Sequence, residues 1–98
     1  MDLNRATLIM KMMSNEIRLN ILRMLYKSEG DVYVNNIEST LNISQSTVSQ
    51  HLSHLRNSSI VACDKKGKNV AYKIIDKDTK NILKYVDDRL KIDNIKVS

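Results

Sequence analysis

Apolar side chains recur at spacings of three and four residues in several separate stretches of this chain. This is the period at which side chains share one face of an α-helix. The pattern predicts a first helix over residues 3–13, a second over 16–27 and a last over roughly 77–92. Asn15 is suited to cap the second helix, and Arg18 within it is expected to be structural. The apolar stripes are Leu3, Ala6, Met10 and Met13 in the first helix and Ile17, Ile21, Leu22 and Leu25 in the second, while Thr79, Ile82, Leu83, Val86 and Leu90 make the last helix amphipathic.

The stretch Ser44–Asn57 predicts a helix with two unlike faces. Val48, Leu52 and Leu55 form its apolar stripe. Its opposite face is made of uncharged polar residues, which offer both hydrogen-bond donors and acceptors. A solvated helix face is usually built from Glu and Lys, so a Ser/Gln face favours contact with groups such as base edges in a major groove. The alternative is an exposed Ser/Gln-rich helix without a partner. The polar face consists of Gln45, Ser46, Ser49, Gln50 and Ser53.

A short helix is predicted just before this one. Asn35 or Asn36 can cap it, and Ile37 and Leu41 would point inward. Asn42 follows, a residue that tolerates the left-handed conformation common at helix ends, and a cap at Ser44 begins the polar helix. Two helices joined by so short a turn have the spacing of a helix-turn-helix.

A β-hairpin is predicted after the polar helix. The β-prone segments 60–64 and 70–75 flank the Gly- and Asn-containing segment 65–69, which carries three lysines. These lysines either keep the tip soluble or, beside a polar helix, contact phosphate. Residues 32–34 form either a very short strand or an extended entry to the short helix.

Composition supports one domain over residues 1–98, mainly α with a small hairpin. The chain has 98 residues with no Pro, Trp or Phe, so its core must be aliphatic. So small a core gains from sharing an apolar face with a second copy, which favours a dimer. Of the net charge of +5, the segment 44–73 supplies +4, because it holds five basic residues and one acidic residue. This concentration of charge indicates an anionic partner.

Cysteine and histidine give little sign of other chemistry. Cys63 is the one cysteine, so no intramolecular disulfide can form, and we expect it to be a small buried strand residue in a reducing, cytoplasmic setting. No apolar run approaches a membrane span and no signal peptide is visible. His51 and His54 have an i, i+3 spacing that could serve a metal, but no further His or second Cys lies near them in the sequence. We expect one to pack beside the buried stripe and the other to lie at the surface or near phosphate.

The whole chain resembles the ArsR/SmtB family of winged-helix repressors. The residues that carry the resemblance are 44–56, Ile60-Val61, the wing from Lys66-Gly67-Lys68 to Tyr72-Lys73-Ile74, and the upstream stretch 13–22. Ser59 departs from the pattern, since the family usually has Gly there, so the polar helix is expected to close differently. The resemblance implies the order helix, helix, short strand, helix, helix, two strands, helix. It also implies a homodimer joined through the first and last helices, on a palindromic operator.

The resemblance also implies roles for individual residues. Residues at the groove end of the polar helix would contact bases, while residues around them and in the wing would contact phosphates. The base-contacting set is Gln45, Ser46, Thr47, Ser49 and Gln50. The phosphate-contacting set is Ser44, Ser53, His54, Arg56, Lys65, Lys66, Lys68 and Asn69. The dimer interface would include Leu3, Ala6, Met10, Ile82, Val86 and Leu90.

Many members of this family bind metal on the third or the last helix. Here residues 37–41 hold no thiol, and the last helix holds Asp87, Asp88 and, beyond it, Asp93, but no His. Carboxylates alone suit zinc, nickel and copper poorly. We therefore expect no metal and no cofactor, and expect these carboxylates to be solvated or paired with Arg89 and Lys91.

The pattern as a whole predicts a sequence-specific DNA-binding repressor that occludes its operator. The alternative is a winged-helix module that binds another protein, which would need neither a Ser/Gln face nor a basic wing. An enzyme is not expected, since no acid/base pair, activated nucleophile or phosphate loop is visible.

Overall fold

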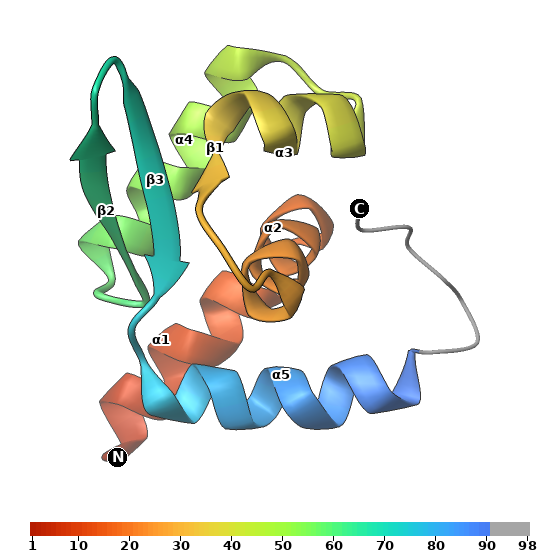
Figure 1. The fold of residues 1–98 in the computed structure, drawn as a ribbon. Coiled ribbons are helices and arrows are strands. Elements are labelled where there is room, and N and C mark those ends of the chain that lie inside the picture. Colours follow the sequence, from red (N-terminus) through yellow and green to blue (C-terminus); the bar gives the residue numbers. More distant parts are fainter. Residues whose placement is uncertain (91–98) are drawn as a thin grey trace.

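The computed structural model describes residues 1–90 as five helices with a small three-stranded antiparallel sheet (Figure 1). This confirms the predicted winged helix-turn-helix order. The elements are α1 (Leu3–Met13), α2 (Glu16–Lys27), β1 (Val32–Tyr33), α3 (Val34–Leu41), α4 (Gln45–Asn57), β2 (Val61–Lys66), β3 (Asn69–Ile74) and α5 (Lys77–Arg89). The predicted last helix ran to about residue 92. Helix α5 ends at Arg89, and residues 91–92 lie outside the described residues.

Four of the helices begin at a capping side chain of the kind that orphan N–H groups require. Asp2, Asn15, Ser44 and Asp76 each accept a hydrogen bond from the backbone N–H three residues further on. The predicted caps at Asn15 and Ser44 are therefore confirmed.

Helix α3 begins differently from the prediction. It starts at Val34, with Tyr33 as its N-cap, so neither Asn35 nor Asn36 caps it. Tyr33 is held in β1 by pairing with Ala71, and the chain turns directly from this strand into the helix. Asn36 instead reaches back, and its Oδ1 accepts the Tyr33 N–H at 2.9 Å. Asn42 ends the helix region at φ 55°, the left-handed conformation predicted for it.

The sheet has the order β1-β3-β2, so β3 is central. Val32 pairs with Tyr72, which makes residues 32–33 a strand and settles that alternative. In the hairpin, Lys66 pairs with Asn69, leaving a two-residue loop of Gly67 and Lys68. The loop is shorter than the predicted segment 65–69. Gly67 has φ 63°, which suits the first position of such a tight loop.

The core is aliphatic, as the composition predicted. Helix α2 lies between the hairpin and α3 at one end of the molecule and α5 at the other (Figure 1), and its Ile21, Leu22 and Leu25 are buried as expected. In α1 the buried residues are Ile9 and Met12, not the stripe that begins at Leu3. The fully inaccessible apolar residues are Ile9, Ile21, Leu22, Ile37, Val48, Leu52, Leu55, Ile60 and Leu83. Among residues 1–90, no helix has the length and apolarity to cross a membrane.

Candidate nucleic-acid interface

Helix α4 is anchored by one face and free on the other. Val48, Leu52 and Leu55 have no exposed surface, and truncating a buried Leu to Ala costs about 2–5 kcal/mol. The polar residues opposite them, namely Gln45, Ser46, Ser49, Gln50 and Ser53, are all exposed. The buried stripe therefore fixes the helix on the core while its Ser/Gln face remains open to a ligand.

Thr47 lies apart from this open face. It is half-buried, and its Oγ1 is 2.9 Å from the Ser44 Oγ. Its backbone N–H also donates to Ser44. Thr47 is thus half-buried and engaged in the N-terminal cap, whereas Ser46, whose Oγ lies 3.3 Å from the Ser44 Oγ, is exposed.

The end of α4 is a Schellman motif with an unusual residue. Ile60 N–H donates to the Leu55 carbonyl, and Ser59 N–H donates to that of Arg56, the two bonds that define the motif. Ser59 takes the left-handed position at φ 59°, where Gly is usual. The expectation that this helix closes differently is therefore wrong: the closure is an ordinary one, made with Ser in place of Gly.

The lysines of the wing differ in how close they lie to carboxylates. Lys65 and Lys68 are exposed, as is Asn69. Lys66 lies 3.9 Å from an oxygen of Asp31 and 3.8 Å from one of Asp64. Such exposed pairs contribute little stability, but the two carboxylates offset the charge of Lys66. Lys68 lies in the loop itself, so it is better placed than Lys66 to bind an anion of a partner molecule.

Arg56 extends the basic surface from the last turn of α4. It is exposed, and its Nη1 lies 3.7 Å from the Cys63 Sγ on β2. This contact with Cys63 raises the pKa of Arg56, a side chain that is charged throughout the physiological pH range in any case. Cys63 is half-buried, less enclosed than we expected.

The wing and the N-terminal end of α4 meet across a shallow groove of about 250 Å³. Gln45 of α4 and Lys68 of the wing lie on its wall, although they are distant in sequence. The groove also brings in Tyr33 and Asn35, which the sequence pattern did not single out, because only the pairing of β1 with β3 places them there.

The two histidines behave as predicted. His51 is half-buried, and its Nδ1 lies 3.4 Å from Nη1 of Arg18. Burial, then the charges of Arg18 and His54, lower the pKa of His51. Arg18 also donates to the carbonyls of Met12 at 2.8 Å and Lys11 at 3.3 Å, closing the end of α1. Its expected structural role is confirmed, and His54 is exposed.

Asp87 corrects one expectation about the last helix. It is buried, and its Oδ1 lies 3.1 Å from Nη2 of Arg23 while its Oδ2 lies 3.6 Å from the Lys27 amine. The carboxylate pairs across to α2 instead of being solvated, because α5 packs with this face toward α2. Asp93 and Lys91 lie outside the described residues. Within residues 1–90, no cluster of three or more His, Cys, Asp or Glu could hold a metal.

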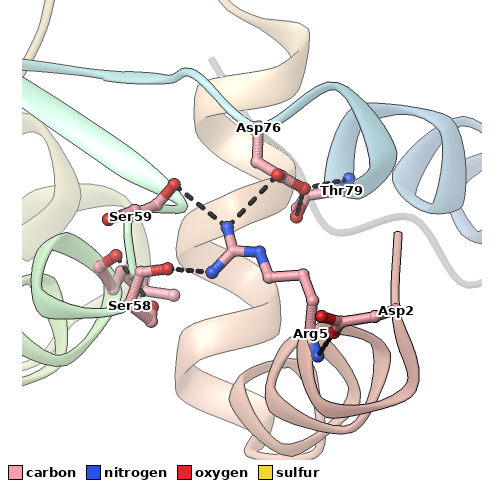
Figure 2. A network of polar contacts seen from close by, with 7 residues as sticks. Asp2, Arg5, Ser58, Ser59, Asp76 and Thr79 are labelled. Atoms are coloured by element: carbon pink, nitrogen blue, oxygen red, sulfur yellow. Dashed lines mark hydrogen bonds and ion pairs between the residues drawn. The ribbon is translucent and has the colours of Figure 1, made fainter.

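Arg5 is a further residue that the sequence pattern did not reveal. Its guanidinium donates to the Ser58 carbonyl, to the Ser59 carbonyl at 3.2 Å and to Asp76 Oδ1 at 3.2 Å (Figure 2). It thereby joins α1 to the end of α4 and to the start of α5. Nothing in the local sequence around Arg5 signals this, since the nearest of these partners in sequence lies 53 residues away.

The residues predicted for a dimer interface differ in exposure. Leu3 and Met10 are exposed, with 81% and 53% of their surface accessible. Ala6, Ile82, Val86 and Leu90 are half-buried. Tyr85 on α5 is also exposed, at 69%, and it was not predicted because it lies outside the aliphatic stripe. Together they give α1 and α5 an apolar surface that the described chain leaves uncovered.

Comparisons with known proteins agree on one family. The family model described as bacterial regulatory protein, arsR family, matches residues 15–62. The chain is 37% identical over 79 residues to the transcriptional activator HlyU of Vibrio cholerae, covering 81% of this chain and 71% of HlyU. It is 36% identical over 84 residues to an HTH-type transcriptional regulator of Methanocaldococcus jannaschii, covering 86% and 93% of the two chains.

Solved structures give the same result for the fold. HlyU from Vibrio cholerae superposes with a TM-score of 0.80 at 34% identity, over 88% of this chain and 94% of that one. The transcriptional repressor PagR of Bacillus anthracis superposes with a TM-score of 0.77 at 31% identity, over 86% and 94%.

Proposed function

This chain belongs to the ArsR family of bacterial regulatory proteins and is a DNA-binding transcriptional regulator, and we propose that it acts as a dimeric repressor covering a palindromic operator. The observation that carries the proposal is the exposed Ser/Gln face of α4 beside a basic wing. Occlusion of a promoter requires nothing beyond tight binding, which makes repression the simplest mechanism. The similar proteins include an activator and a repressor, so the sign of regulation is part of the proposal.

The exposed face of α4 supplies the base contacts in this proposal. Gln45 and Gln50 can each pair bidentately with adenine, while serine hydroxyls serve either as donors or as acceptors. Because Thr47 is half-buried and also engaged with Ser44, its contribution is the smallest of the set. The proposed base-contacting residues are Gln45, Ser46, Thr47, Ser49 and Gln50.

Phosphate contacts surround that face. They fix the register of the protein on DNA and supply affinity that falls with added salt. Arg56 and the wing lysines contribute charge, and Ser44, Ser53, His54 and Asn69 contribute hydrogen bonds. All these residues are exposed. The proposed charged contacts are Arg56, Lys65, Lys66 and Lys68.

We place the dimer interface on α1 and α5. Regulators of this family form homodimers, and the exposed Leu3, Met10 and Tyr85 are apolar surface that a second copy would cover. The half-buried Ala6, Ile82, Val86 and Leu90 complete the interface. A two-fold axis there presents two α4 helices to half-sites about one helical turn apart.

The remaining features of the proposed regulator are general. Residues 1–98 act as one winged-helix domain, without catalysis, metal or cofactor, in the cytoplasm where the DNA is. Membership of a family of transcription regulators supports the absence of catalysis and the location beside DNA. The lack of a thiol in residues 37–41 and of a histidine in residues 77–89 supports the absence of a metal.

The experiment is selection of a binding sequence from random DNA by the purified protein, followed by affinity measurements across a salt series. We expect a palindrome bound at least about a thousandfold more tightly than random DNA, the low end for specific regulators. Equal affinity for selected and random DNA would contradict the proposal and favour a winged-helix module that binds protein.

A further inference from the structure

Two parts of the molecule that are distant from Arg5 in sequence converge on its guanidinium. The side chain leaves α1 and lies between the end of α4 and the start of α5 (Figure 2). It is 27% exposed, and the side chain of Asp76 is 15% exposed. A guanidinium is a rigid planar fork, so contacts to three acceptors fix its neighbours relative to one another more firmly than a flexible ammonium would.

Each of its partners already has a defined place. Ser58 and Ser59 follow the last turn of the recognition helix α4, and their N–H groups donate to the His54 and Arg56 carbonyls of that turn. The negative end of the helix dipole at this place favours a cation. Ser59 holds the left-handed conformation there. Asp76 uses its other oxygen, Oδ2, to accept the Thr79 backbone N–H and the Thr79 hydroxyl, both at 2.7 Å. Arg5 therefore adds a connection between elements that are each complete without it.

The same connection joins α4, whose polar face is proposed to contact bases, to α1 and α5, the helices of the proposed dimer interface. Arg5 belongs to α1, which exposes Leu3 and Met10, and Asp76 begins α5, which exposes Tyr85. Helix α4 is about 20 Å long at 1.5 Å per residue, so a tilt of about 5° at this end moves its other end by nearly 2 Å. A shift of that size in both subunits displaces the polar faces from two half-sites at once.

We propose that Arg5 is a positioning residue that holds the two recognition helices of the dimer at a set separation, and so determines which half-site spacing the protein accepts. The inference rests on the proposed function, since it presupposes a dimer on two half-sites. Arg5 makes no contact with DNA in this scheme, and it acts through the carbonyls at the end of α4.

The test compares variants on DNA of different half-site spacing. The probes are the selected palindrome, the same palindrome with one base pair inserted or removed at its centre, and a single half-site. The variants are Arg5→Met, which removes the guanidinium, and Arg5→Lys, which keeps the charge. Asp76→Asn keeps one oxygen for the α5 cap and removes the second carboxylate oxygen that Arg5 uses. Lys84→Met, an exposed residue of α5, is the control for the loss of one positive charge.

The wild-type protein should bind the altered spacings at least about a hundredfold more weakly than the original. For Arg5→Met and Asp76→Asn this discrimination should shrink to about tenfold or less, while single half-site affinity and the dimer dissociation constant by ultracentrifugation stay within about twofold. Arg5→Lys should lie between, and Lys84→Met should keep the wild-type discrimination. A variant that was merely less folded would lose affinity equally on every probe.

Wild-type discrimination in both Arg5→Met and Asp76→Asn overturns the inference while leaving the proposed function intact. Should Arg5→Met fail to fold, Asp76→Asn and Arg5→Lys decide the question alone. If the wild-type protein selects no palindrome, the proposed function itself has failed, and this result is distinct from any outcome among the variants.

Discussion

Asp87→Ala is expected to be among the most destabilising single changes in this chain, because it leaves a buried cation without its partner. The Arg23 side chain is only 3% exposed, and Asp87, at 11%, meets it at 3.1 Å. Removing one member of such a pair costs about 3–5 kcal/mol, mostly as the penalty of the uncompensated charge. Lys27 lies 3.6 Å from the same carboxylate but is 43% exposed, so its share is below about 1 kcal/mol.

The expected loss is a large part of the free energy of unfolding of a small domain, which is about 5–15 kcal/mol. The assay is urea unfolding followed by circular dichroism, at one protein concentration, because the stability of a dimer depends on concentration. The double variant Arg23→Met/Asp87→Leu is the matched control, since it replaces both charged side chains by apolar side chains that still fill the space. It should fall within about 2 kcal/mol of the wild type, because apolar replacement of a buried pair is often neutral or stabilising.

A loss below about 1 kcal/mol for Asp87→Ala would refute this reasoning, since water would then be reaching Arg23 in the folded protein. The pair also bears on function. A carboxylate held by Arg23 and Lys27 is poorly available to a metal, so we expect added zinc to leave DNA affinity unchanged in the wild type.

Three further outcomes are expected. Gln50→Ala should weaken binding to the selected operator by about 1–3 kcal/mol and leave random DNA nearly unaffected, as filter binding on both probes would show; equal losses would remove Gln50 from base readout. Lys68→Ala should reduce the slope of log affinity against log salt concentration by about 0.9 for each phosphate that Lys68 neutralises. Lys66→Ala should reduce this slope by less, because Asp31 and Asp64 offset the charge of Lys66. Equal slopes for the two variants would contradict this pairing. Burial, then the charges of Arg18 and His54, lower the pKa of His51 in the folded protein. His51 therefore binds a proton more readily in the unfolded chain. It contributes stability above pH 6.5, and this stability is lost as the pH falls below 6.5. Wild-type stability should therefore fall relative to His51→Gln between pH 7.5 and 5.5, and parallel curves would argue against the shift.

Local pattern was enough to predict most of the elements and the open face of α4. A helix period shows in residues three and four apart, and capping by Asn15 or Ser44 involves a residue only three positions away. The exposure of the Ser/Gln face follows from the burial of Val48, Leu52 and Leu55 opposite it. These features depend on near neighbours in the chain, so the sequence alone determined them.

Pairing between strands, and the long polar contacts, could not be predicted in the same way. The short helix begins at Val34 because Tyr33 pairs with Ala71, a partner that no local pattern identifies. Nothing in the sequence indicated that Asp31 would lie near the charge of Lys66. The two residues form an ion pair because β1 and β2 lie on either side of β3 in the folded sheet.

The sequence by itself therefore determined that this chain is a helix-turn-helix regulator with a polar reading helix and a basic wing. Only the tertiary structure decided how that helix is held. Arg5 meets Ser58 and Arg23 meets Asp87 across 53 and 64 residues of chain. Contacts of that range exist only after the core has brought the helices together, because each such pair depends on the packing of every element between its members.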